Sequence, residues 1–227
     1  MDQTEFLQHW NYFCSLASKL DSTRDYVYHG LKDDGHGEPI MIHGNVYSDI
    51  FKQIIILSAS EFEVVSKVLC GLCGETSKNI VEISRALLQH FPKIIKTEII
   101  TAYYLAEPMK DWRIESGNKV IGLEWWKAYN SLKHNEVDSF KLATLENAIV
   151  SLSCLYVLDL YLMYKVCGSL AIAFTFPPTY FKSKYTAIPM TSGEGLLPDF
   201  GDKTPTEVLK GRYPGLFDSI GSTELKR

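Results

Sequence analysis

The fold prediction rests on residues 125–134, WWKAYNSLKH, and on the apolar run that follows at residues 138–167, DSFKLATLENAIVSLSCLYVLDLYLMYKVC. In the first half of that run, apolar residues recur every three or four positions, which is the period of a helix with one buried face. In the second half nearly every residue is apolar, so a helix there must be covered on all sides. We therefore predict one helix of about 30 residues, with Asp138 as its N-cap, packed inside a bundle or a dimer.

A membrane-spanning segment is the alternative for residues 149–176, because about 20 apolar residues suffice to cross a bilayer. Asp159 and Lys165 lie inside this stretch, and a charged residue at mid-membrane costs about 2.5–3.5 kcal/mol on insertion scales. No cluster of Lys or Arg flanks it on one side. We therefore favour a helix that is buried in protein and expect no membrane association.

Length and composition set bounds on the function. The chain has 227 residues, enough for one large domain or for a domain with appendages. Its net charge is −4 and it has only five Arg residues, which argues against broad nucleic-acid binding but leaves room for a local site that acts on RNA. The first ten residues lack the pattern of a signal peptide, and five Cys residues, an odd number, suit free thiols. We expect a cytoplasmic protein.

Elsewhere the spacing of apolar residues predicts helices that are separated by Gly and Pro. These helices are expected at residues 5–20, 47–72 and 77–91. Residues 31–45 form a Gly-rich loop with at most a short strand or hairpin at 39–43. Residues 94–105 fit a strand or a helix, and we favour the helix because helices are predicted on both sides. Residues 107–122 form a connector with a turn at 116–118.

These elements divide the chain into three parts. Residues 1–45 hold an N-terminal helix and the Gly-rich loop, and residues 46–168 hold the helical bundle. Residues 169–227 contain six Pro residues and several Gly-rich turns. We expect this C-terminal part to be an irregular, extended tail that packs on the bundle rather than a second core.

The polar residues of WWKAYNSLKH are the strongest candidates for chemistry. If the segment is helical, Asn130 and His134 lie one turn apart on one face, with Tyr129 and Lys133 beside them. A His in such a group can take a proton from a 2′-hydroxyl or give one to the leaving oxygen, while Lys steadies the phosphate. The alternative is structural: the polar residues cap and cross-link helices, and the Trp pair belongs to the core.

The segment resembles the signature of HEPN-type proteins, a superfamily of small helical bundles that includes antiphage and toxin ribonucleases. Their motif is an Arg, often followed by Asn, and then a His about four to six residues after the Arg, near a dimer interface. Asn130 and His134 match the Asn and the His, whereas Tyr129 occupies the Arg position. The Trp pair and the YN-x-x-KH core are similar to one bacterial branch, in which Arg commonly follows KH where this chain has Asn135 and Glu136.

This resemblance covers roughly residues 47–167 and implies an all-α, HEPN-like bundle that forms a homodimer through the helix at 138–167. It implies that His134 is the general acid or base of a metal-independent ribonuclease, that Asn130 orients it or the phosphate, and that Lys133 supplies positive charge. Tyr129 cannot supply the planar fork with which Arg orients a phosphate. Lys127 or Lys133 would have to substitute as a point charge.

Glu61 completes the predicted site. In HEPN-like bundles an acidic residue on the early helix often faces the motif helix, so we expect Glu61 to pair with Lys133 or to raise the pKa of His134. Glu63 is the competing candidate. The two are about 200° apart on a helix, so at most one of them can face the site. The alternative is that both face solvent.

Three further patterns carry little chemistry. The Arg85–His90 pair has HEPN-like spacing but lies inside an amphipathic helix, where its side chains diverge by about 140°. Cys70 and Cys73 form a single CxxC at a helix end, without the second pair that zinc requires. His29, His36 and His43 recur every seven residues in the Gly-rich loop, which is a weak metal pattern. We therefore expect no metal and no cofactor.

Two functions follow from these predictions. The first is a metal-independent ribonuclease or toxin in bacterial antiphage defence, with RNA as substrate. The second is a non-catalytic HEPN-like module that binds a partner protein or a nucleotide. The negative net charge and the Tyr at the Arg position favour the second function, and the polar run in an apolar context favours the first. A membrane-associated defence protein that uses residues 149–176 is a remote third.

Overall fold

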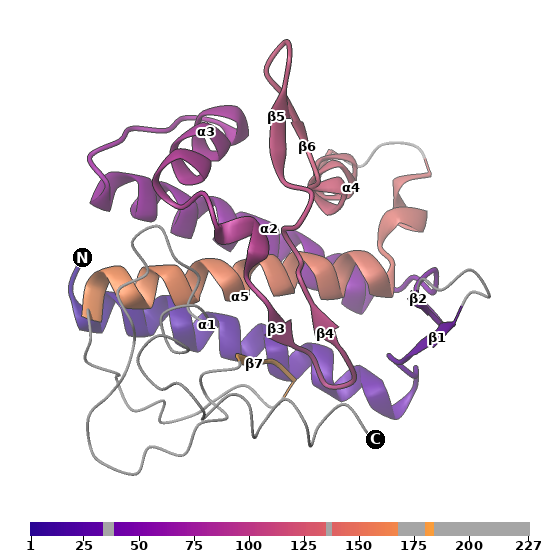
Figure 1. The fold of residues 1–227 in the computed structure, drawn as a ribbon. Coiled ribbons are helices and arrows are strands. Elements are labelled where there is room, and N and C mark those ends of the chain that lie inside the picture. Colours follow the sequence, from indigo (N-terminus) through magenta and orange to yellow (C-terminus); the bar gives the residue numbers. More distant parts are fainter. Residues whose placement is uncertain (34–38, 135–137, 168–179, 184–227) are drawn as a thin grey trace.

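The computed structural model describes residues 1–33, 39–134, 138–167 and 180–183 (Figure 1). Three long helices lie side by side at its centre: α1 (Gln3–Ser22), α2 (Asp49–Leu72) and α5 (Leu145–Cys167). Helix α5 packs against both α1 and α2. Two shorter helices, α3 (Ile80–His90) and α4 (Glu124–Lys133), pack on α2. The described part of the chain is therefore mainly helical, as predicted.

Side-chain caps set the starts of the helices. Asp2 accepts a hydrogen bond from the Glu5 N–H (2.9 Å), and the Glu5 carboxylate accepts one from the Asp2 N–H (2.7 Å), so the two form a capping box. Ser48 caps α2 by accepting from the Phe51 N–H, and Asn79 caps α3. Each cap satisfies a backbone donor that the helix leaves free and contributes about 1 kcal/mol. The helices predicted from apolar spacing begin within a few residues of these caps.

Helix α5 is covered on all sides within one chain. Every residue from 151 to 160 is buried, and α1, α2 and α4 supply the cover. In the described part, α5 is the one helix long and apolar enough to cross a membrane, and 83% of that apolar window is buried inside the protein. The prediction of a helix buried in a bundle is confirmed. The homodimer stays a prediction. It was suggested by an apolar helix that needs cover, and here the chain itself supplies that cover.

The start of α5 differs from the prediction. Asp138 has a φ of 62°, in the left-handed region, and begins a short 3₁₀ helix, η3 (Ser139–Leu142), instead of capping α5. Thr144 supplies the cap, since its hydroxyl accepts from the Asn147 N–H at 3.2 Å. The chain between η3 and α5 is held extended by backbone hydrogen bonds to residues 46–48. The Ser48 N–H donates to the Ala143 carbonyl, and the Leu145 N–H donates to the Val46 carbonyl.

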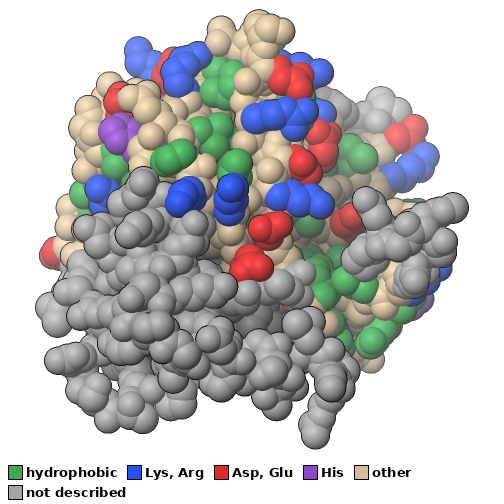
Figure 2. Space-filling view, viewed as in Figure 1, with side chains coloured by type: hydrophobic (Ala, Val, Ile, Leu, Met, Phe, Trp, Pro, Cys, Tyr) green, Lys and Arg blue, Asp and Glu red, His purple; other side chains and the backbone are tan. Residues whose placement is uncertain are grey.

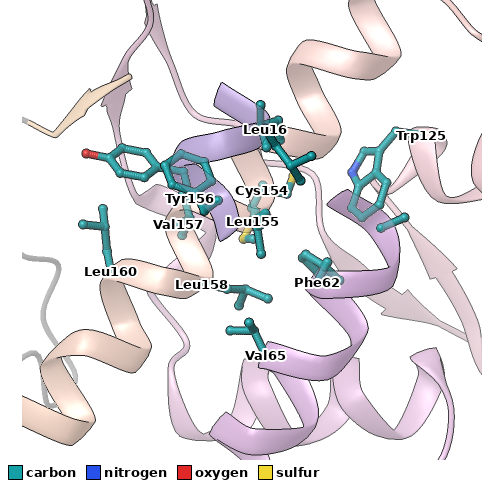
Figure 3. Packing of buried hydrophobic residues seen from close by; sticks show 14 of the residues in the cluster. Leu16, Phe62, Val65, Trp125, Cys154, Leu155, Tyr156, Val157, Leu158 and Leu160 are labelled. Carbon is teal, nitrogen blue, oxygen red and sulfur yellow. The ribbon is translucent and has the colours of Figure 1, made fainter. Parts of the chain in front are cut away.

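The hydrophobic core joins α1 to the rest of the bundle. Figure 3 shows Leu16 of α1, Phe62 of α2 and Leu158 of α5 in one packed cluster. Phe13 of α1 also stacks on Tyr156 of α5, with ring centroids 5.1 Å apart. The N-terminal helix, which was expected to lie outside the bundle at residues 1–45, therefore shares one core with α2 and α5.

Three small antiparallel sheets in the described part correct the all-α prediction. The first pairs β1 (Leu31–Asp33) with β2 (Pro39–Met41), where a short strand or hairpin was expected. The second has the order β4 (Leu105–Ala106), β3 (Ile99–Ile100), β7 (Lys182–Ser183). The third pairs β5 (Arg113–Glu115) with β6 (Lys119–Ile121) across the predicted turn at 116–118. Positive φ angles at Gly117 and Asn118 form that turn.

The helix predicted for residues 94–105 is wrong. A single 3₁₀ turn, η2 (Ile94–Lys96), is followed by the β3–β4 hairpin. Thr101 fixes the hairpin turn because its hydroxyl accepts hydrogen bonds from the backbone N–H groups of Tyr103 and Tyr104 and donates one to the Tyr104 carbonyl. Such local side-chain bonds compete with a helix, and the β-branched residues of this stretch favour strand.

A short C-terminal segment is anchored in the bundle. Tyr180 and Phe181 are buried, and the Phe181 ring lies 5.8 Å from Phe13 and 5.7 Å from Tyr156. Strand β7 follows directly and pairs with β3. The rest of the predicted tail at 169–227 lies outside the described residues.

Candidate functional site

Helix α4 has one buried face and one exposed face. Its buried residues recur at steps of three and four, and they are Trp125, Ala128, Tyr129 and Leu132. On the other side, Lys127 forms an ion pair with Glu124 at 2.5 Å between two exposed side chains, which contributes little to stability. The sequence WWKAYNSLKH thus folds as an amphipathic helix whose apolar side faces α2.

The Trp pair fixes α4 to α2. The Trp125 and Phe62 rings meet edge to face with centroids 5.0 Å apart, and Trp126 lies 6.0 Å from the same Phe62 ring. Figure 3 shows Trp125 next to Phe62. Trp126 continues the contact to Tyr129 at 5.1 Å. Aromatic pairs in such geometry contribute about 0.5–1.5 kcal/mol beyond burial. The Trp pair therefore belongs to the core, in agreement with the structural alternative.

Tyr129, which aligns with the Arg of the HEPN motif in the predicted resemblance, also belongs to the core. Only 4% of its surface is exposed. Lys133, one turn later, donates a hydrogen bond to the Tyr129 hydroxyl at 3.1 Å and lies 5.3 Å from the ring centre. This hydrogen bond is the largest cause of the raised pKa of Lys133. The Lys133 ammonium is thus directed toward the Tyr129 side chain of its own helix.

Asn130 and His134 point away from this core. Both are exposed, and they are one turn apart, since the His134 N–H donates to the Asn130 carbonyl at 3.0 Å. His134 ends the helix as its C-cap residue. Together with Lys127, Lys133 and Glu124 they form the exposed α4 face, which carries two ammonium groups, one carboxylate, one amide and one imidazole. The structure confirms the adjacency of Asn130 and His134 and places them on an open surface.

Glu61 lies on a different side of α2 from the predicted site. Its carboxylate is hydrogen-bonded to Nδ1 of His9 on α1, and not to Lys133 or His134. Glu63 instead has its charge near Lys133, where it contributes to the raised pKa, and it also pairs with Lys67 at 2.6 Å. The expected pairing of Glu61 with the motif helix is therefore wrong, because α1 takes the place next to that carboxylate.

The other polar patterns have structural roles in the described part of the chain. Arg85 donates to Asn118 of the β5–β6 hairpin, and His90 contacts Glu75, so the Arg85–His90 pair does not form one site. Cys70 and Cys73 are free thiols, and burial raises the pKa of both. Among the described residues, no group of three or more His, Cys, Asp or Glu side chains is arranged to bind a metal.

His29 is buried in a polar network instead of lining a metal site. Its Nδ1 is hydrogen-bonded to the Tyr180 hydroxyl at 2.9 Å, and its Nε2 to the Thr23 hydroxyl at 3.0 Å. Burial, with the nearby charge of Arg24, lowers the pKa of His29 to about 4. His43 is exposed, and His36 lies outside the described residues. His29 therefore links the end of α1 to the C-terminal segment.

Sequence reasoning missed a polar group that joins the three long helices. His9 of α1 pairs with Glu61 of α2, and Glu61 lies close enough to Asp159 of α5 for its charge to raise the Asp159 pKa. Asp159 is fully buried, and neither carboxyl oxygen has a hydrogen-bond partner within the described ranges. The sequence held one signal for this polar group: Asp159 lies inside an apolar helix, where a buried carboxyl is rare.

No family model, curated protein or solved structure matches the chain. By its fold, the described part of the chain is a mainly helical bundle with small peripheral sheets.

Proposed function

We propose that the chain is a HEPN-like helical module that binds a partner through the exposed α4 face and does not cleave RNA. The observation that carries this proposal is the state of Tyr129. It occupies the position of the catalytic Arg, lies in the core, and binds Lys133 through its hydroxyl. A scissile phosphate at this face would meet no planar cation, because Tyr129 cannot supply the fork of an Arg.

The chemistry of the face favours an anionic partner. Lys127, Lys133 and His134 supply cationic or hydrogen-bond-donating groups, and the Asn130 amide supplies a donor and an acceptor. The molecular surface seen in Figure 2 carries basic and acidic side chains interspersed with apolar ones. Such mixed charge supports recognition of a compact group, such as a nucleotide phosphate or a carboxylate of a partner protein, over a long nucleic-acid track.

The binding proposal is tested by following backbone amide NMR shifts of the full chain during titration with ATP, GTP and a tRNA. We expect shifts concentrated at residues 124–134, with at least five-fold weaker binding in Lys133→Ala and His134→Ala. Lys110→Ala, which removes an exposed cation elsewhere, is the matched control. For a protein partner, a photo-crosslinker at Asn130 should capture it, and His134→Ala should reduce capture. Binding that is insensitive to both variants would refute the proposal.

One observation supports the ribonuclease as a second candidate. Asn130 and His134 are adjacent and open to solvent, so a second copy of the chain could complete a site around them. His134 would then be the general acid or base in a defence toxin. RNA cleavage that requires His134 separates this candidate from the binding module.

A further inference from the structure

A groove lies between the first turns of α1 and the last turns of α2, at the end of the bundle marked N in Figure 1. Its volume is about 420 Å³, which is within the range of small-molecule sites, roughly 300–1,000 Å³. Apolar and polar side chains both line it: Met1, Val68 and Leu72, and Glu5, Gln8 and His9. The groove therefore offers an apolar surface next to hydrogen-bonding groups.

His9 is held in a defined orientation at the polar part of the groove. Its Nδ1 is hydrogen-bonded to the Glu61 carboxylate, and only 18% and 16% of the two side chains are exposed. A carboxylate that accepts from Nδ1 keeps a proton on that nitrogen, which leaves Nε2 as the ring nitrogen that can accept from a ligand. Within the described residues, Nε2 has no hydrogen-bond partner. The ring is thus prepared to accept a hydrogen bond.

Asp159 supports this arrangement from the interior. Burial first, and the charge of Glu61 second, raise the pKa of Asp159 well above its usual range. Two carboxyl groups so close together do not both ionise readily. The neutral form of Asp159 is therefore favoured in the core, next to the pair of Glu61 and His9. A polar group built from three helices is unusual when it only fills space, because each buried polar atom costs free energy.

Gly71 is a lining residue of the groove at which a side chain can be added. It lies in the last turn of α2 and lines the groove. A Cβ placed on Gly71 would have no atom within 4 Å. A larger side chain at this position would project into open space without a clash in the described structure.

We propose that this groove binds a small organic ligand with an apolar body and a hydrogen-bond-donating head group, a hydroxyl or an amine, whose proton is accepted by His9 Nε2. Val68 and Leu72 contact the apolar body, and Glu61 fixes the tautomer of His9. The site is separate from the exposed α4 face, so it stands independently of the partner-binding proposal.

Three probes with the same phenyl ring test the head-group rule: 2-phenylethanol, phenethylamine and 3-phenylpropionate. Each is titrated into the full chain and followed by backbone amide shifts and by the side-chain nitrogen signals of His9. Probes of this size bind with dissociation constants of about millimolar. We expect the alcohol and the amine to shift the His9 signals and to bind at least five-fold more tightly than the carboxylate, which has no donor at neutral pH.

Variants at Gly71 separate binding from folding. Gly71→Leu should fill the groove and weaken binding at least five-fold, while the helix keeps its stability because Leu is the better helix former. Gly71→Ala adds one methyl group and is the matched control. His9→Ala should remove the preference for the donor probes. The proposal is overturned by equal binding of all three probes, by no binding of any probe at its solubility limit, or by unchanged binding in Gly71→Leu.

Discussion

At the scale of single residues, Tyr129 sets the limits of the candidate site. A Tyr on the polar face of α4 could have supplied a phenol to a substrate, but its ring packs on Trp126 and its hydroxyl binds Lys133. Asn130 and His134, which follow it in the motif, remain exposed. The side chains of this segment therefore divide between the core and the surface, and Tyr129 is a packing residue.

Truncation of Tyr129 tests this packing role. We expect Tyr129→Ala to lower the free energy of unfolding by about 3–5 kcal/mol, as for other buried aromatic residues. Tyr129→Phe removes only the hydrogen bond from exposed Lys133 and should cost about 1 kcal/mol or less. Urea denaturation measures both, with Asn130→Ala as the exposed neighbour that should change little. If Tyr129→Ala left the free energy of unfolding unchanged, α4 would not be anchored through this ring.

His29 makes a prediction about pH. Its folded-state pKa of about 4 lies below its ordinary value near 6.5, so the unfolded chain binds more protons between these values. Stability from His29 is therefore lost as the pH falls from 6.5 to 4, by up to about 3 kcal/mol. In thermal unfolding, the difference between wild type and His29→Asn should shrink across this window. The exposed His43→Asn should follow the wild type at every pH, and a constant His29→Asn difference would contradict the assignment.

At the scale of elements, apolar periodicity predicted α1, α2, α3 and α5 because each helix buries one stripe or its whole surface. It failed for residues 94–105, where the hydroxyl of Thr101 bonds to the backbone and tertiary pairing with β7 completes a sheet. It also missed that α5 begins after Thr144, because the pairing with residues 46–48 is not visible in local sequence. Glu61 was misplaced for the same reason, since its partner His9 is 52 residues away.

Asp159 tests the packing of α5. Its pKa is raised in the folded state, so its contribution to stability is present below the unfolded pKa and is lost as the pH rises through the folded value. The loss is about 1.4 kcal/mol per pH unit within that window. Asp159→Asn avoids this loss, so its melting temperature should rise relative to that of wild type as the pH increases above the ordinary Asp pKa of about 4. The exposed Asp25→Asn is the control, and a difference independent of pH would contradict a neutral buried Asp159.

At the scale of the whole molecule, the described structure is one core to which distant segments contribute. Helix α1, expected as part of an N-terminal extension, lies against α5, and the segment 180–183 closes over both. This arrangement covers α5 without a second chain. The sequence could predict that α5 needs cover, but the identity of the covering segments depends on contacts between residues far apart in the chain.

Phe181 tests the contribution of the C-terminal segment. We expect Phe181→Ala to destabilise the protein by about 3–5 kcal/mol, because the ring is buried against Phe13 and Tyr156. Tyr26→Ala, at a residue that is 87% exposed, should have little effect in the same urea denaturation. Equal stability of the two variants would mean that the segment does not contribute to the core.

RNA cleavage in the absence of metal separates a binding module from a ribonuclease. Purified wild type and His134→Ala are incubated with total RNA and with tRNA, with and without nucleotide, and circular dichroism confirms that both are folded. A binding module with Tyr129 in its core predicts no cleavage by either protein. Cleavage by wild type that is lost in the folded His134→Ala variant would contradict the account and establish the ribonuclease.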